Sequence, residues 1–263
     1  VEEPNIRRGG QSGVQRILQA DRLLYAKRQT GHTYRSLLHP FGRPTVLRER
    51  DALLGARKAG VTVPEIVYCA TEHSRQGWRG LLVTAALEGY QPISDWYLTQ
   101  GREHHGETAH QHLLQLIAEN LARLHKARWQ HGCLYAKHVF VRFDGERPQV
   151  ALLDLEKSRR RLSRVGAAHH DLRQLRRHSP WSAEDWQQLL HGYRQVVLRT
   201  AHATRYALLC GGIGVLTALL HAGFAASGHQ EFNLPLSIAT IAACLASGAG
   251  LMLKARRPAN SGG

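Results

Sequence analysis

Apolar residues follow two different periods within the first 205 positions of the chain. Segments with the two-residue period of β-strands come first. They are residues 13–18, 23–28, 65–70 and 81–86. Ala20 and Asp21 separate the first two segments and predict a tight turn, so we expect a hairpin there. Residues 45–59 have helical spacing and predict a helix that interrupts the run of strands.

Helical spacing dominates the second half of this region. Apolar positions recur every three or four residues over 109–126 and predict a long helix. A further helix is predicted over 182–198, where Ser182 is a suitable N-cap and Asp185 takes the capping-box position. A small sheet followed by helices is the order expected of a two-lobed α+β fold.

The composition changes sharply after Arg205. Residues 206–226 and 234–253 carry no formal charge, and each is close to the ~20 residues that cross a bilayer. Basic residues flank the pair on its outer sides, so the positive-inside rule puts both ends in the cytoplasm. We therefore expect a two-helix transmembrane hairpin. A buried helical hairpin of a soluble domain is the alternative interpretation.

The chain is strongly basic, with a formal net charge of +15. Arginines gather in pairs and triplets such as residues 159–161, which suit phosphorylated or otherwise anionic partners, including anionic lipids. The net charge is the only feature that would suggest nucleic-acid binding, because the sequence has no zinc-finger, RNP or recognition-helix pattern. We therefore do not expect a nucleic-acid partner. The four cysteines form no C-x-x-C pair, and two of them lie in apolar segments. This argues against a disulfide framework and against a zinc site, and it favours a reducing compartment.

Residues 101–112 form a polar segment with four histidines. Several histidines in a short span can hold a metal ion, but the carboxylate–His spacing of a known site is missing. We expect a surface loop inserted before the long helix.

Two polar loops follow short strands in the middle of the chain. His131 opens the first loop, His138 closes it, and the strand 139–142 follows. A second apolar strand, 150–153, ends in Asp154. This is the layout of a kinase catalytic loop followed by a metal-binding loop, and it predicts Asp154 as a Mg²⁺ ligand.

The two histidines of the first loop take different predicted roles. His138 stands where kinases have a second metal ligand, although Mg²⁺ prefers oxygen, so contact with a phosphate is the alternative. His131 is predicted to brace the loop.

A nucleotide site is predicted at the beginning of the chain. Its phosphate-binding backbone is a glycine cluster whose members are Gly9, Gly10, Ser12 and Gly13, for which an ordinary turn is the alternative reading. Lys27, on the following strand, is predicted to hold the α- and β-phosphates of ATP rather than to be a solvated edge charge. Glu49 is its predicted carboxylate partner, with Asp51 as second candidate; a surface ion pair is the alternative for Glu49.

These segments together resemble the lipopolysaccharide kinase family, the Kdo- and heptose-kinase group that includes InaA-type proteins. The matching runs are RRGGQSGVQR, YAKRQ, LARLHKARWQHGCLYAKHVFV and VALLDLEKSRR, within residues 3–200. The resemblance implies a protein-kinase-like fold, ATP and Mg²⁺, and phosphorylation of a heptose or Kdo hydroxyl in the lipopolysaccharide core. It also implies that Asp171 braces the catalytic loop.

One position departs from the family. Active heptose kinases carry Asp where this chain has Cys133, and a thiol does not orient a hydroxyl as a carboxylate does. Because the transition state of phosphoryl transfer is loose, transfer does not strictly require that base, and His131 or Asp171 are candidate substitutes. A membrane-anchored pseudokinase that binds nucleotide or a partner protein is therefore the second hypothesis. An antibiotic kinase is a further one, although such kinases usually keep the Asp.

The predicted organisation is a two-lobed protein-kinase-like fold followed by a membrane hairpin, at the cytoplasmic face of a bacterial inner membrane. Its parts are residues 1–90 with the glycine-rich loop and the ATP lysine, the mainly helical lobe 91–205 with both loops, the hairpin 206–253 and a basic cytoplasmic tail 254–263.

Overall fold

The computed structural model describes residues 5–7, 10–36, 39–75, 77–226 and 242. The chain divides into two compact units, residues 1–193 and 194–263. All candidate site residues of the sequence analysis fall in the first unit, which is described here by itself.

A five-stranded antiparallel sheet forms the first part of this unit, with strand order β1-β2-β3-β7-β6. The strands are β1 (Asn5–Arg7), β2 (Gly10–Gln19), β3 (Arg22–Thr30), β6 (Ile66–Ser74) and β7 (Gly77–Ala85). A separate ribbon of β4 (Thr33–Ser36) and β5 (His39–Pro44) leads into helix α1 (Thr45–Lys58). The predicted turn between β2 and β3 is confirmed, since Ala20 and Asp21 both have positive φ.

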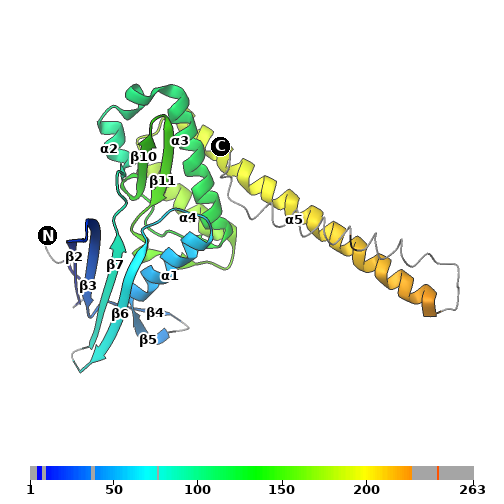
Figure 1. Ribbon diagram of the computed structural model, residues 1–263, viewed down its shortest axis with the longest axis horizontal. Helices are drawn as coiled ribbons and strands as arrows, with labels where there is room; N and C mark the ends of the chain where they lie inside the picture. Colours follow the sequence, from blue (N-terminus) through cyan, green and yellow to red (C-terminus); the bar gives the residue numbers. More distant parts are fainter. Residues whose placement is uncertain (1–4, 8–9, 37–38, 76, 227–241, 243–263) are drawn as a thin grey trace. The chain divides into compact units, whose positions relative to one another are not determined.

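Helix α1 lies beside β6 and β7 (Figure 1). It buries Val46, Ala52, Leu53 and Ala56. Gly80 of β7 makes this approach close, because a Cβ at that position would lie 2.5 Å from a methyl carbon of Val46. Helix α1 is therefore fixed against β7. Strand β7 is the neighbour of β3, and β3 carries Lys27.

The second part of the unit is built around a small sheet of order β11-β10-β8. Its strands are β8 (Gln91–Pro92), β10 (Val139–Asp144) and β11 (Arg147–Leu152), and β9 (Trp129–Gln130) pairs separately with β12 (Arg159–Arg160). The helices are α2 (Ile93–Leu98), α3 (Gly101–Lys126), α4 (Arg164–Arg177) and the beginning of α5 (Ala183–Ala226), whose residues after 193 belong to the second unit. Two short 3₁₀ turns are η1 (Ala136–His138) and η2 (Leu155–Lys157).

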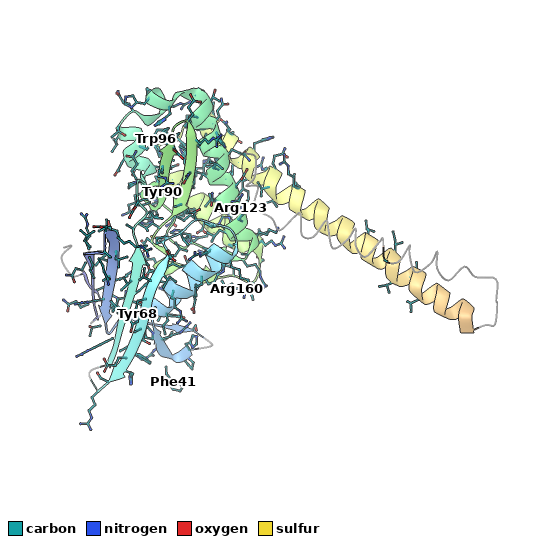
Figure 2. All side chains as sticks on the ribbon, in the orientation of Figure 1. Phe41, Tyr68, Tyr90, Trp96, Arg123 and Arg160 are labelled. Carbon is teal, nitrogen blue, oxygen red and sulfur yellow. The ribbon has the colours of Figure 1, made fainter. Side chains whose placement is uncertain are left out.

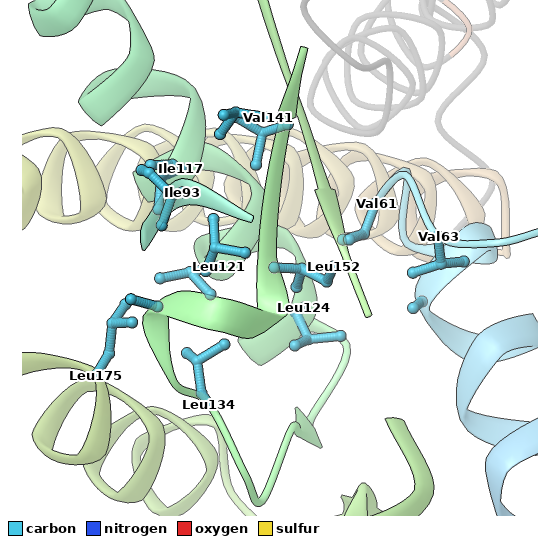
Figure 3. Close-up of a cluster of buried hydrophobic side chains, with 14 of the residues drawn as sticks. Val61, Val63, Ile93, Ile117, Leu121, Leu124, Leu134, Val141, Leu152 and Leu175 are labelled. Carbon is cyan, nitrogen blue, oxygen red and sulfur yellow. The ribbon is translucent and has the colours of Figure 1, made fainter. Parts of the chain in front are cut away.

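A continuous apolar core joins α3 to the β10–β11 hairpin and to the loops on either side of it (Figure 3). Leu121 and Leu124 of α3 are almost fully buried, as are Leu134 in the first loop, Leu152 at the end of β11 and Leu175 of α4. Burial of leucine side chains stabilises by roughly 1.5–3 kcal/mol each. The core therefore fixes the backbone of two loops, the one before β10 and the one after β11.

Most predicted elements are confirmed, including the capping box of α5. There the Ser182 side chain accepts from the Asp185 N–H at 3.1 Å, and the Asp185 carboxylate accepts from the Ser182 N–H at 3.2 Å. The helix itself continues beyond the predicted end at residue 198, to Ala226.

The predicted surface loop 101–112 is wrong, because these residues form the beginning of α3, with a kink at Gly106. The reason is that two of the histidines pack against aromatic side chains, which the polar composition of the segment does not indicate. His110 is fully buried against Tyr97, and His105 stacks on Phe143 at 3.8 Å between ring centroids. Trp96, labelled in Figure 2, lies parallel to the His110 ring and helps to bury it.

The predicted membrane hairpin is not confirmed. Within the part of the chain that is described, no helix is both long enough and apolar enough to span a membrane. The second predicted span, 234–253, and the tail 254–263 lie outside the described residues apart from position 242.

Candidate active site

Lys27 lies at the centre of a group of buried charges. Its Nζ donates to Glu49 Oε2 at 2.7 Å and to Glu156 Oε2 at 2.5 Å. The first contact joins β3 to α1 and is the pair that the sequence suggested. Asp51, the second candidate, instead pairs with Arg43 at 2.9 Å and with Arg50.

Glu156 is a carboxylate that the sequence analysis did not single out. It sits in η2, two residues after Asp154, and its backbone oxygen accepts from Arg48 Nε at 2.7 Å. Helix α1 therefore holds Lys27 through Glu49 and the loop after β11 through Arg48. This arrangement brings the strand lysine and the predicted metal loop together, although they are more than 100 residues apart in sequence.

The ionisation of this cluster follows from its surroundings. Burial alone would lower the pKa of Lys27, but the charges of Glu49 and Glu156 outweigh it and raise that pKa above its ordinary value. Burial raises the pKa of the Glu49 carboxyl against the opposing effect of Lys27. One ammonium group thus serves two carboxylates, and Glu156 is the more exposed of them, with 27% of its side chain accessible against 12% for Glu49. A phosphate that approaches Lys27 would meet Glu156 as its competitor.

Asp171 of α4 holds the loop that contains Cys133. Its carboxylate is fully buried and accepts from the backbone N–H groups of His131 at 2.6 Å and Gly132 at 3.0 Å, and from His125 Nε2 at 3.1 Å. Burial alone would raise the pKa of this carboxyl, but the bonds from His125, Gly132 and His131 hold it below the ordinary value. The contacts are those of a group that fixes a loop.

Gly132 is required at its position for two reasons. Its φ of +81° is rarely adopted by other residues, and a Cβ there would lie 2.6 Å from the Lys157 carbonyl oxygen. On the other side of Cys133, the Leu134 N–H donates to Gln174 Oε1 at 2.9 Å. The backbone on both sides of Cys133 is therefore held in place by α4 and by the segment after Asp154.

His131 and Asp171 cannot take over the proton-accepting role of the missing Asp, contrary to the sequence-based suggestion. The His131 ring is buried and its Nε2 donates to the Leu153 carbonyl at 2.9 Å. Burial lowers the pKa of this ring, so it stays neutral. Asp171 is enclosed by the donors just described. Both side chains support the loop and have no exposed face for a substrate hydroxyl.

Cys133, His138 and Asp154 come together at the ends of the two loops. A ligand atom of each lies within 4.8 Å of the other two. His138 Nε2 lies 3.4 Å from Asp154 Oδ2, and Lys157 Nζ lies 3.8 Å from Cys133 Sγ. Asp154 has φ and ψ of 60°, a left-handed conformation that places it at the turn into η2. Its side chain is 41% accessible, whereas Cys133 is buried.

The glycine cluster takes a different form from the predicted loop. Strand β2 already begins at Gly10, so Gly10, Ser12 and Gly13 are strand residues, and Gly9 lies outside the described residues. Gly10 is buried against His32 and the Thr30 carbonyl, where a Cβ would clash. Ser12 Oγ accepts from Gln29 Nε2 at 3.4 Å. Close strand packing accounts for Gly10 in this structure.

The side chains of the site differ in how well they suit the ATP and the divalent cation that a kinase binds. Lys27, fixed by Glu49, fits a nucleotide phosphate, and the accessible carboxylate of Asp154 fits a cation that is also held by phosphate oxygens. His138 and Cys133 offer nitrogen and sulfur, which do not fit Mg²⁺ because this ion prefers oxygen ligands. The predicted His138–Mg²⁺ contact is therefore poorly matched in its chemistry.

A two-part fold with a lysine–glutamate pair beside a metal-type carboxylate defines the class of kinase-like phosphotransferases. Residues 1–193 match the model of the lipopolysaccharide kinase (Kdo/WaaP) family. The chain is 41% identical to protein InaA of Escherichia coli (strain K12) over 190 residues, which is 72% of this chain and 88% of that protein. The chain belongs to the lipopolysaccharide kinase (Kdo/WaaP) family.

The fold resembles that of WaaP in a solved complex with acyl carrier protein, with a TM-score of 0.56 and 17% identity over 73% of this chain and 78% of that chain. This likeness shows the shared fold. Residues 187–258 match a family of unknown function (DUF6713). The kinase match thus ends close to where the first compact unit ends.

Proposed function

We propose that this protein is an ATP-dependent kinase that phosphorylates a heptose or Kdo hydroxyl of the lipopolysaccharide core. The observation that carries the proposal is the Lys27–Glu49 pair, held by α1 against the loop of Asp154 and Glu156. Bound ATP would supply the phosphoryl group, and its accompanying cation would neutralise charge on the phosphates. Lys27 would orient the nucleotide phosphates, Asp154 would hold the cation, and Asp171 keeps the loop that contains Cys133 in one conformation.

The surface beside Asp154 suits an anionic acceptor. Lys157, Arg159 and Arg160 follow it in the chain, and all three are exposed. Arg160 is labelled in Figure 2. Exposed arginines can form bidentate contacts with phosphate or carboxylate groups, which supports a phosphorylated or acidic sugar as the acceptor.

We propose, from the sequence, that the protein acts at the cytoplasmic face of the bacterial inner membrane. This part of the proposal rests on the uncharged segments 206–226 and 234–253 and on the basic residues that flank them. A lipid-linked acceptor with anionic groups would be met at that surface.

The function is tested by phosphate transfer from ATP to purified core oligosaccharide, with Asp154→Ala compared to wild type. We expect turnover to fall at least about tenfold, a loss that even indirect partners of a metal ion commonly produce when they are removed. Asp154 is accessible, but alanine tolerates the left-handed backbone at this position less well than aspartate does, by about 1 kcal/mol. Asp154→Ala should therefore unfold at a slightly lower temperature than wild type and still be folded in the assay. Equal turnover by the two proteins would contradict the proposed function.

The pseudokinase remains the second candidate function, because Cys133 occupies the position of the family's Asp. We expect Cys133→Asp to raise phosphotransfer to the same acceptor by about tenfold or more, since a positioned base contributes up to ~10²–10⁴-fold where proton transfer matters. Cys69→Ser, at a half-buried cysteine of β6, is the control. ATP-dependent thermal stabilisation without transfer in either protein would favour a pseudokinase.

A further inference from the structure

The His138 ring is held in one tautomer. Its Nδ1 lies 2.6 Å from the carbonyl oxygen of Cys133. A carbonyl oxygen only accepts, so Nδ1 must carry the proton and donate it. In the neutral ring the other nitrogen, Nε2, then presents an unshared electron pair. Donation from the second ring nitrogen to a backbone carbonyl is the usual way in which proteins orient a histidine that binds a metal.

The electron pair of Nε2 faces another electron-pair donor. Asp154 Oδ2 lies 3.4 Å away. Two such atoms repel each other unless a cation lies between them, either a proton or a metal ion. The separation is also the one that tetrahedral coordination requires, because two ligands at about 2.0–2.1 Å from a tetrahedral ion are about 3.4 Å apart.

Cys133 supplies a third donor at the same place. The ligand atoms of Cys133, His138 and Asp154 all lie within 4.8 Å of one another. To surround one tetrahedral ion, the widest pair needs to close by only about 1 Å. Sulfur, imidazole nitrogen and a single carboxylate oxygen form a donor set suited to borderline cations such as Zn²⁺ and Co²⁺ rather than to Mg²⁺.

The three donors are held by separate parts of the fold. Asp171 and Gln174 fix the backbone on both sides of Cys133, and the Leu153 N–H donates to the His138 carbonyl at 3.0 Å. Cys133 and His138 are buried, whereas Asp154 is accessible and leaves a path for an ion. The Lys157 ammonium near Sγ belongs to an exposed side chain, which is free to turn into solvent when a cation enters.

We propose that Cys133, His138 and Asp154 form a binding site for a zinc-class divalent cation, with a fourth position left for water or a phosphate oxygen. The site binds the ion in the absence of nucleotide. It goes beyond the proposed kinase function and does not depend on phosphotransfer, since binding is measured without ATP or acceptor.

The test uses Co²⁺ as a probe for the full chain freed of metal, because a thiolate ligand gives bound Co²⁺ an intense charge-transfer absorption. We expect wild type to bind one equivalent with this band, Zn²⁺ to displace it, and excess Mg²⁺ to leave it unchanged. Cys133→Ser should lose the band while Cys69→Ser keeps it. Asp154→Asn, at an accessible position that leaves the fold intact, should bind Co²⁺ at least about tenfold more weakly.

Three results would overturn the proposal. One is a wild-type protein without the charge-transfer band at saturating Co²⁺, which would leave a proton as the cation between His138 and Asp154. Another is a band that persists in Cys133→Ser, which would assign it to a different cysteine. The last is a Co²⁺ affinity in Asp154→Asn that equals that of wild type. This test remains valid even if Cys133→Ser fails to fold. None of these results bears on the ATP-dependent assay, so the two proposals fail separately.

Discussion

Replacing Lys27 with Met should lower phosphate transfer to core oligosaccharide by about 10²–10³-fold, the scale on which loss of one preorganised charge donor acts. Methionine preserves the length and apolar stem of the side chain but removes the ammonium group. That group is held between Glu49 and Glu156, and it is the charge that would meet the phosphates of ATP. Initial rates at saturating acceptor and varied ATP separate a loss of nucleotide binding from a loss of turnover.

Lys58→Met is the matched control for this variant. Lys58 lies at the exposed end of α1 and has no place in the cluster, so the same chemical change there should leave the rate unchanged. Thermal unfolding of both variants shows whether Glu49 and Glu156, left without their cation, destabilise the fold. Equal rates for Lys27→Met and Lys58→Met would remove Lys27 from the mechanism.

Asp171→Asn should lower the free energy of unfolding by at least about 1–3 kcal/mol. The substitution keeps the shape of the side chain but replaces one carboxylate oxygen with an NH₂ group, which faces the donors that Asp171 now accepts from. Each buried donor that loses its acceptor costs about 1–3 kcal/mol. The NH₂ group removes the acceptor of two of these donors if it replaces Oδ2, and of one if it replaces Oδ1. Urea denaturation followed by tryptophan fluorescence measures the effect, because all five tryptophans lie within residues 78–186.

Asp144→Asn is the control, at the exposed last residue of β10, and it should change stability by less than about 0.5 kcal/mol. The effect at Asp171 also depends on pH in a defined direction. Its pKa in the folded protein lies below the ordinary value, so its stabilisation is complete above that ordinary value and is lost as the pH falls through the lower one. The difference between wild type and Asp171→Asn should therefore shrink below about pH 4. A difference that is constant down to pH 2 would contradict this account.

Sequence patterns predicted the Lys27–Glu49 pair because both residues lie in regular elements. Lys27 alternates with apolar neighbours on β3, and Glu49 has a fixed position on α1. Glu156 escaped notice because it follows Asp154 in an irregular turn, where no periodicity marks which side chains point toward Lys27. The sequence offered one signal for Glu156, namely that it is a second carboxylate only two residues after Asp154.

For the segment 101–112 the sequence analysis made a prediction that was wrong. Its polar composition predicted a loop, but composition measures only the average preference of a segment for water. The structure gives His105 and His110 aromatic partners from α2 and β10, and such partners cannot be recognised from the local sequence.

The sequence by itself determined the order of the elements, the kinase-like pairing of strand lysine and helix glutamate, and the replacement of Asp by Cys133. These depend on periodicity and on residue identity, which are local. The tertiary structure alone decided that Glu156 shares Lys27, and it supplied the contacts by which Asp171 holds the loop of Cys133, a role that the family resemblance had implied. It also brought Cys133, His138 and Asp154 within reach of a single cation. These contacts join segments that are far apart in the chain, and only the packing of α1, α3 and α4 on the strands sets their distances.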